Sequence, residues 1–144
     1  MQVPFGTILI DVSSGADGEF DRSFLERTGH EVLVCHGPEH RGVCPLLAGT
    51  GCDKVDKAHG IIFALDLDDA QHRAILRRYG KITRPDVPIR VVVRPGQRAK
   101  YADLVEDFEV WEHEPTVADL DGFAAGVEAV DRFTSSKAPL REGP

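Results

Sequence analysis

The chain has no run of basic residues: 17 lysines and arginines against 24 acids give a formal charge of −7 over 144 residues. A nucleic-acid backbone needs a basic face to neutralise its phosphates, so we expect no nucleic-acid partner. No apolar run approaches the roughly 18 residues that a membrane span requires. The first residues, Met1-Gln2-Val3-Pro4, have neither the charged nor the apolar part of a signal peptide. These absences predict a cytoplasmic protein with no membrane partner.

Cysteine is also scarce. Three cysteines, an odd number, argue against a disulfide scaffold in a reducing compartment. The sequence contains no P-loop, no Gly-x-Gly-x-x-Gly and no Ser-His-Asp order, so it gives no support for an enzyme. A hydrolase or phosphotransfer activity would require acids at the strand ends to bind Mg²⁺.

The most informative stretch that is present covers residues 60–69. Five consecutive apolar residues, 61–65, predict a strand buried on both faces, as in a parallel sheet. Three acids follow at once: Asp66, Asp68 and Asp69. Open α/β sheets place their ligand crevice at the carboxyl ends of the strands, so these acids mark a candidate site.

Strand and helix patterns alternate along the rest of the chain. The patterns predict an α/β fold, a doubly wound five-stranded parallel sheet with helices on both faces. The flavodoxin-like strand order 2-1-3-4-5 fits the apolar first and third strands, and a Rossmann-like order is the alternative. The strands are expected at 7–12, 31–35, 60–65, 89–93 and 108–112. Helices are expected at 19–28, in broken form within 44–58, at 69–79 with Gly80 as the stop, at 98–105, and from a Thr116–Asp119 capping box onward. A single domain should cover residues 1–133, and Ser, Lys, Pro and Gly predict a disordered tail over 134–144.

This layout resembles a bacterial response-regulator receiver domain over about residues 5–133. Asp66 matches the phospho-accepting aspartate at the end of the third strand, and Asp11 matches one of the Mg²⁺-binding acids after the first. The resemblance implies that partners, or a second copy in a homodimer, bind the face made by the fourth helix, the fifth strand and the last helix.

Two positions depart from the receiver pattern. Val93 or Arg94 stands where receivers usually end the fourth strand with Ser or Thr, and Glu114 stands where they carry a lysine. A phosphoryl group needs charge compensation, and an acid in place of the lysine would repel it. The chain is therefore expected to be a pseudo-receiver, a non-enzymatic regulatory or protein-interaction domain with a degraded phosphorylation site.

The acids Asp11, Asp66 and Asp68 have two interpretations. Convergent carboxylates at strand ends suit a divalent cation or a phosphoryl group. Alternatively, Asp68 caps the following helix and Asp66 is solvated in a turn.

A second candidate cluster combines cysteine and histidine within eighteen residues: Cys35, His36, His40, Cys44 and Cys52. These ligand types suit zinc or an iron–sulfur cluster, and the thiols alone could form a redox switch. The cysteine spacing matches no compact metal knuckle, and Cys35 also reads as a small buried hydrophobe. The alternative function is therefore a metal, iron–sulfur or thiol redox sensor.

Overall fold

A five-stranded parallel sheet forms the centre of the chain in the computed structural model, which describes residues 6–12, 18–36, 49, 52–82 and 86–142. The strand order is β2-β1-β3-β4-β5 and every pairing is parallel, which confirms the predicted fold class and order. The strands are β1 (Thr7–Val12), β2 (Glu31–Cys35), β3 (Gly60–Ala64), β4 (Ile89–Val92) and β5 (Glu109–Trp111).

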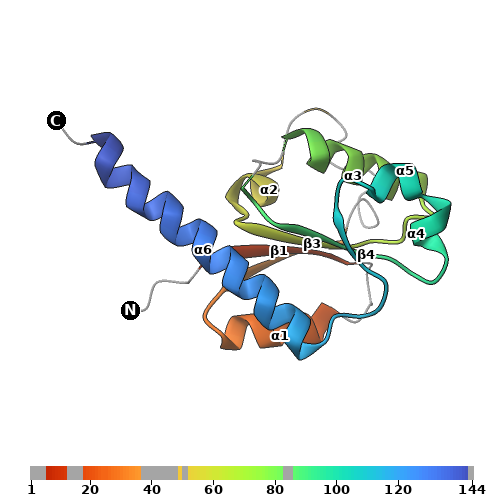
Figure 1. Cartoon of the computed structure of the whole chain (residues 1–144), viewed down its shortest axis with the longest axis horizontal. Coiled ribbons are helices and arrows are strands. Elements are labelled where there is room, and N and C mark those ends of the chain that lie inside the picture. The colour runs from red at the N-terminus through yellow and green to blue at the C-terminus, as the bar shows by residue number, and fades with distance from the viewer. Residues whose placement is uncertain (1–5, 13–17, 37–48, 50–51, 83–85, 143–144) are drawn as a thin grey trace.

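Helices cover both faces of the sheet (Figure 1). One layer contains α1 (Gly18–Arg27) and α6 (Val117–Glu142), and the other contains α2 (Asp53–Lys57), α3 (Ala70–Ile82), α4 (Gln97–Lys100) and α5 (Ala102–Val105). Strand side chains alternate between the layers. Ile8, Ile10 and Ile62 pack in the α1–α6 core, while Leu9 and Ile61 pack in the core on the α3 side. All six residues of β1 are buried, as expected of a central strand.

The helix after β3 differs from the prediction at both ends. Its cap is Asp69, whose Oδ1 accepts hydrogen bonds from the backbone N–H groups of Gln71 (2.8 Å) and His72 (3.3 Å), so Asp68 is not the cap. Gly80 does not stop the helix, because α3 continues to Ile82. The last turns are held by burial of Tyr79, which outweighs the poor helix propensity of the glycine.

The segment between β4 and β5 was expected to be one helix over 98–105. It is two single turns, α4 and α5, interrupted at Tyr101, whose backbone leaves the helical region (φ −116°, ψ 36°). Of the broken helix expected within 44–58, the structure has α2 at Asp53–Lys57, and residues 44–48 lie outside the described part of the chain.

The last helix begins with the predicted capping box. The Thr116 N–H donates to Asp119 Oδ2 (3.0 Å), and the Asp119 N–H donates to Thr116 Oγ1 (3.2 Å). Its backbone continues to Glu142 and projects beyond the sheet (Figure 1), through most of the tail expected to be disordered. The domain boundary near residue 133 stays a prediction. No helix in the described part of the chain combines the length and apolarity needed to cross a bilayer.

Gly60, the first residue of β3, lies directly under α6. A Cβ atom added there would overlap Val127 Cγ2 and lie 3.0 Å from Phe123 Cζ. We expect Gly60→Ala to lower the free energy of unfolding by about 1–3 kcal/mol, because both neighbours are fixed in the core. Urea titration measures the change. Gly122→Ala on α6, where an added Cβ meets nothing within 4 Å, is the matched control and should be neutral or stabilising. Equal stability of Gly60→Ala and the wild type would show that the close approach of β3 and α6 is wrong.

Candidate functional site

Asp66 lies just beyond β3, at the edge of the sheet where all five strands end, and both of its carboxylate oxygens are engaged. Oδ1 accepts hydrogen bonds from the Asp68 N–H (3.0 Å) and from Gln97 Nε2 (2.7 Å). Oδ2 forms an ion pair with Arg94 Nη1 at 2.5 Å. The side chain is 32 % exposed, so this pair is only partly screened by solvent. Asp66 is therefore a carboxylate neutralised from within the chain.

Gln97 connects the two partners of Asp66. Its Oε1 accepts a hydrogen bond from the Arg94 N–H (3.0 Å) while its Nε2 donates to Asp66, and the residue is buried. The turn Pro95-Gly96 brings Gln97 back over Arg94, and Gly96 has a left-handed backbone (φ 84°) that a residue with a side chain rarely adopts. The turn after β4 is thus tied to the turn after β3 by an ion pair and an amide.

Asp68 has partners of its own on the segment between β4 and β5. Its Oδ1 accepts a hydrogen bond from the Tyr101 hydroxyl (2.6 Å) and contacts Lys100 Nζ at 3.1 Å. Arg73 and Lys100 both lie over the Tyr101 ring, with the Arg73 Cζ atom and the Lys100 Nζ atom 5.1 and 5.3 Å from its centroid. The break at Tyr101 between α4 and α5 lies in this contact. Asp68 therefore holds Tyr101 and Lys100 at the surface and does not cap α3.

The charges at this edge act on the protonation of both acids. Burial works to raise the pKa of Asp66, but the hydrogen bonds from Asp68 and Gln97 and the charge of Arg94 hold that pKa below its usual range. The hydrogen bond from Tyr101 and the contact with Lys100 lower the pKa of Asp68. Both groups are ionised at neutral pH and each has a cation beside it.

Asp11 does not share these contacts. It is 1 % exposed and pairs in register with Cys35 and Phe63, so it lies inside the sheet rather than beyond its edge. Its Oδ2 accepts a 2.6 Å hydrogen bond from the hydroxyl of Tyr79 on α3. Burial raises the pKa of Asp11 to about 7, although the hydrogen bonds of Tyr79 and Cys35 and the charge of Lys54 act in the opposite direction.

The three predicted acids thus occupy two environments, one shared by Asp66 and Asp68 and one around Asp11. Within the described residues, no group of three or more His, Cys, Asp or Glu side chains could hold a metal ion. The carboxylates of Asp66 and Asp68 instead have Arg94 and Lys100 as their counterions.

The cysteine and histidine set is placed only in part, because His40 and Cys44 lie outside the described residues. Cys35 and Cys52 are half-buried and pack against the core on the α3 side, as small hydrophobes do. Cys35 also forms a hydrogen bond with Asp11. The His36 ring contacts the Val12 carbonyl through Nδ1 (2.9 Å). The described members of the set therefore contribute to packing, to backbone contacts and, through Cys35, to the surroundings of Asp11.

Comparison with known proteins gives matches in structure alone: no protein-family model and no curated protein matches the sequence. A receiver domain of a response regulator from Clostridium thermocellum has a TM-score of 0.63 at 18% identity, with 90% of this chain and 97% of that chain covered. The receiver domain of a Francisella response regulator has a TM-score of 0.57 at 11% identity, with 90% and 98% covered. The Mn²⁺-bound form of response regulator Rcp1 has a TM-score of 0.54 at 16% identity, with 89% and 93% covered.

The chain has the receiver fold. Identities this low establish the fold alone, so the functional positions have to be assessed from the contacts of this chain. Val93, which like Arg94 is a candidate for the receiver Ser/Thr position, is buried and its N–H donates to the Trp111 carbonyl (2.9 Å). Glu114, which the receiver resemblance matches to the lysine, is exposed. Burial, and to a smaller extent the charge of Glu114, raise the pKa of Asp21 on α1 to about 6.

Sequence reasoning missed Arg94 and Gln97 as partners of Asp66. A signal was present: Arg94 comes two residues after the end of β4, the strand next to β3, so it lies at the same edge of the sheet as Asp66. The charged partner of Asp66 within this receiver fold is therefore a cation from the turn after β4, and Glu114 interacts with a different acid.

Proposed function

We propose that the chain is a regulatory protein-interaction domain of receiver fold that works without phosphorylation. The observation that supports this is the contact set of Asp66, in which Arg94 and Gln97 occupy the carboxylate oxygens that a phosphoryl acceptor must expose. A guanidinium beside a carboxylate neutralises it and holds it in one geometry. The domain would thus be a pseudo-receiver whose acceptor aspartate has a structural role.

The ion pair also has a consequence for the neighbouring surface. It joins the turn after β3 to the segment Arg94–Gln97, from which α4 begins. If this link required a phosphoryl group, the segment from Arg94 onward would have one conformation with the group and another without it. Here side chains of the chain itself form the link, so the surface formed by α4 and the residues after it keeps a single conformation.

That surface is the face made by α4, α5, β5 and α6, which we propose binds a protein partner or a second copy of the chain. Arg98 on α4 and Glu112 after β5 form an exposed ion pair across it (2.7 Å). β5 is an edge strand of only three residues. Short edge strands do not readily pair with another sheet, so contacts of this face would be made mainly by side chains.

Self-association tests the homodimer form of this proposal. We expect the mass of the wild type by light scattering to rise with concentration into the high micromolar range, equally with and without acetyl phosphate and Mg²⁺. Arg98→Glu places two acids together on the face and should weaken association by about ten-fold. Arg22→Glu on α1, which also breaks an exposed ion pair, is the control and should have no effect. A wild type that remains a monomer would contradict the homodimer form, and a mass that changes with acetyl phosphate would contradict a domain that works without phosphorylation.

A further inference from the structure

A groove runs between α3 and the α4–α5 segment. Its larger part is a cavity of about 760 Å³ that reaches the start of β4 at Val87 and Pro88, the opposite end of the strand from Asp66. A second cavity of about 280 Å³ adjoins it along α4 and α5, with Arg77, Asp103 and Leu104 lining both. The groove is therefore elongated and lies away from the candidate site.

The groove exists because the helical cover is short at this point. α4 and α5 have four residues each, against thirteen in α3, and the chain re-enters the sheet at Glu109 soon after α5 ends. Gly80 adds to the opening: a Cβ atom there would lie 3.4 Å from Phe108 Cζ, so the missing side chain leaves that ring uncovered. An exposed glycine inside a helix lowers helix stability by about 1 kcal/mol relative to alanine.

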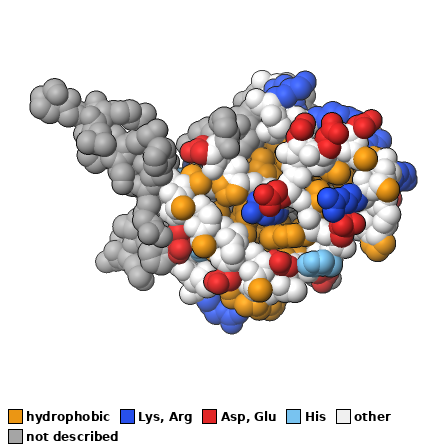
Figure 2. Space-filling model, viewed as in Figure 1, with side chains coloured by type: hydrophobic (Ala, Val, Ile, Leu, Met, Phe, Trp, Pro, Cys, Tyr) orange, Lys and Arg blue, Asp and Glu red, His pale blue; other side chains and the backbone are white. Residues whose placement is uncertain are grey.

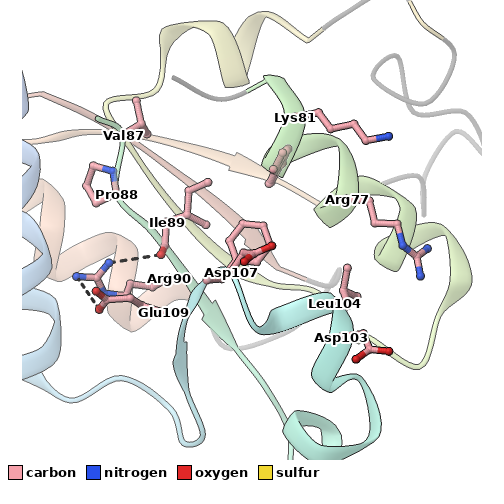
Figure 3. Close-up of a pocket in the computed structure, with 13 residues that line it drawn as sticks. Arg77, Lys81, Val87, Pro88, Ile89, Arg90, Asp103, Leu104, Asp107 and Glu109 are labelled. Atoms are coloured by element: carbon pink, nitrogen blue, oxygen red, sulfur yellow. Dashed lines mark hydrogen bonds and ion pairs between the residues drawn. The ribbon is translucent and has the colours of Figure 1, made fainter. Parts of the chain in front are cut away.

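The floor of the groove is apolar and its two walls carry opposite charge. Ile89, Leu104 and Phe108 are half-buried in the floor. Figure 2 shows hydrophobic side chains gathered in the middle of one face with charged side chains around them. Figure 3 shows Arg77 and Lys81 along α3 on one side and Asp103, Leu104 and Asp107 on the other.

The charged walls are not paired with each other. Within the described part of the chain, neither Arg77 nor Lys81 takes part in an ion pair, and the nearby ion pairs are Arg90–Glu109 and Lys100–Asp68. Four exposed charges, Arg77, Lys81, Asp103 and Asp107, thus flank an apolar floor without partners across the gap. This arrangement suits an occupant with an apolar stripe, one acidic edge and one basic edge.

We propose that the groove binds an amphipathic helix of a partner protein, with its acidic edge along α3 and its basic edge along α5. A helix fits because the groove lies beside α3 where the crossover helix is interrupted, and helices pack side by side over sheets at about 10 Å. A second copy of this chain is a poor occupant. Among the described residues the large exposed hydrophobics are Phe20 on α1 and Val117 on α6, so no helix presents an exposed apolar stripe over the residues whose side chains the structure describes. The proposal does not depend on the state of Asp66.

Three synthetic helical peptides of about four turns test the proposal by fluorescence anisotropy. All carry the same leucine stripe at i, i+3, i+4 and i+7 spacing, and they differ only in their edges: acidic and basic, both acidic, or both basic. The controls carry the same charge on both edges. A peptide with its acidic and basic edges merely exchanged would not serve as a control, because it could bind in the reverse direction along the groove and present the same charges to the two walls. We expect the peptide with opposite edges to bind the wild type in the micromolar range, and the other two to bind at least about ten-fold more weakly.

Variants of the chain then assign the binding to the groove. Gly80→Leu should fill the groove and abolish binding without loss of helix, whereas Gly126→Leu, in open space on α6, should bind as the wild type does. Arg77→Glu combined with Lys81→Glu makes both walls acidic and should transfer the preference to the peptide with two basic edges. Failure of all three peptides to bind, equal binding of the three, or unchanged binding by Gly80→Leu would overturn the proposal. A wild-type dimer that the peptide dissociates, and that Gly80→Leu abolishes, would also overturn it, because the occupant would then be a second copy.

Discussion

The free energy of unfolding of the Asp11→Asn variant, relative to that of the wild type, should increase as the pH rises from 4 to 8. In the folded state burial raises the pKa of Asp11 to about 7 from an ordinary value of 3.8. Between these two values the folded wild type holds a proton that the unfolded chain releases, so its free energy of unfolding falls as the pH rises. This stability is fully present below pH 3.8 and is lost by the time the pH passes 7.

The loss corresponds to at most about 4 kcal/mol, because one pKa unit is worth about 1.4 kcal/mol. Asn keeps an oxygen that can accept from Tyr79 but does not titrate, and any cost of its amide N–H groups is the same at every pH. The difference in unfolding free energy between variant and wild type, from urea titrations at pH 4, 6 and 8, isolates Asp11 from Asp21, whose raised pKa affects both proteins alike.

Asp68→Asn is the control for the sign. The pKa of Asp68 is lowered, so this acid contributes stability above its ordinary pKa that is lost as the pH falls. The difference for Asp68→Asn should therefore stay nearly constant between pH 6 and 8 and increase only as the pH falls toward and below 3.8, whereas that for Asp11→Asn increases as the pH rises. A difference for Asp11→Asn that stays constant between pH 4 and 8 would show that Asp11 is not buried as described.

The sheet could be predicted from sequence because its central strands are buried on both faces. Runs such as Thr7–Val12 and Gly60–Ala64 have few other stable placements than the middle of a parallel sheet. The ends of the helices depend on tertiary contacts as well as on local sequence. Gly80 signals a helix end, but burial of the neighbouring Tyr79 extends α3 to Ile82.

The candidate site could be predicted only in outline. Asp66 was located because it follows the most apolar strand of the chain. The hydrogen bond of Asp11 could not be predicted from the sequence, because the residue that donates it, Tyr79, lies 68 residues away along the chain. Alternation within β1 does place Asp11 on the same face as Leu9, under α3, and that signal argues against a position at the sheet edge.

We expect Asp66 to resist phosphorylation by small phosphodonors. Attack by its carboxylate requires an oxygen to leave Arg94 or to give up the hydrogen bonds of Gln97 and Asp68. Charge-assisted hydrogen bonds contribute about 1.5–3 kcal/mol each, and partial exposure reduces this, so the total is about 3 kcal/mol. An added barrier of this size slows transfer by about a hundred-fold. If the receiver resemblance holds at these positions, Val93 has no hydroxyl to offer a phosphoryl oxygen and Glu114 puts an acid where a cation is needed.

Intact-mass spectrometry after incubation with acetyl phosphate and Mg²⁺ tests the central claim most directly. We predict that the mass of the wild type and of Asp66→Asn stays unchanged under conditions that modify a known receiver domain in the same tube. A mass increase of one phosphoryl group on the wild type that is absent from Asp66→Asn would contradict the claim, and would show that Arg94 and Gln97 release Asp66 for reaction.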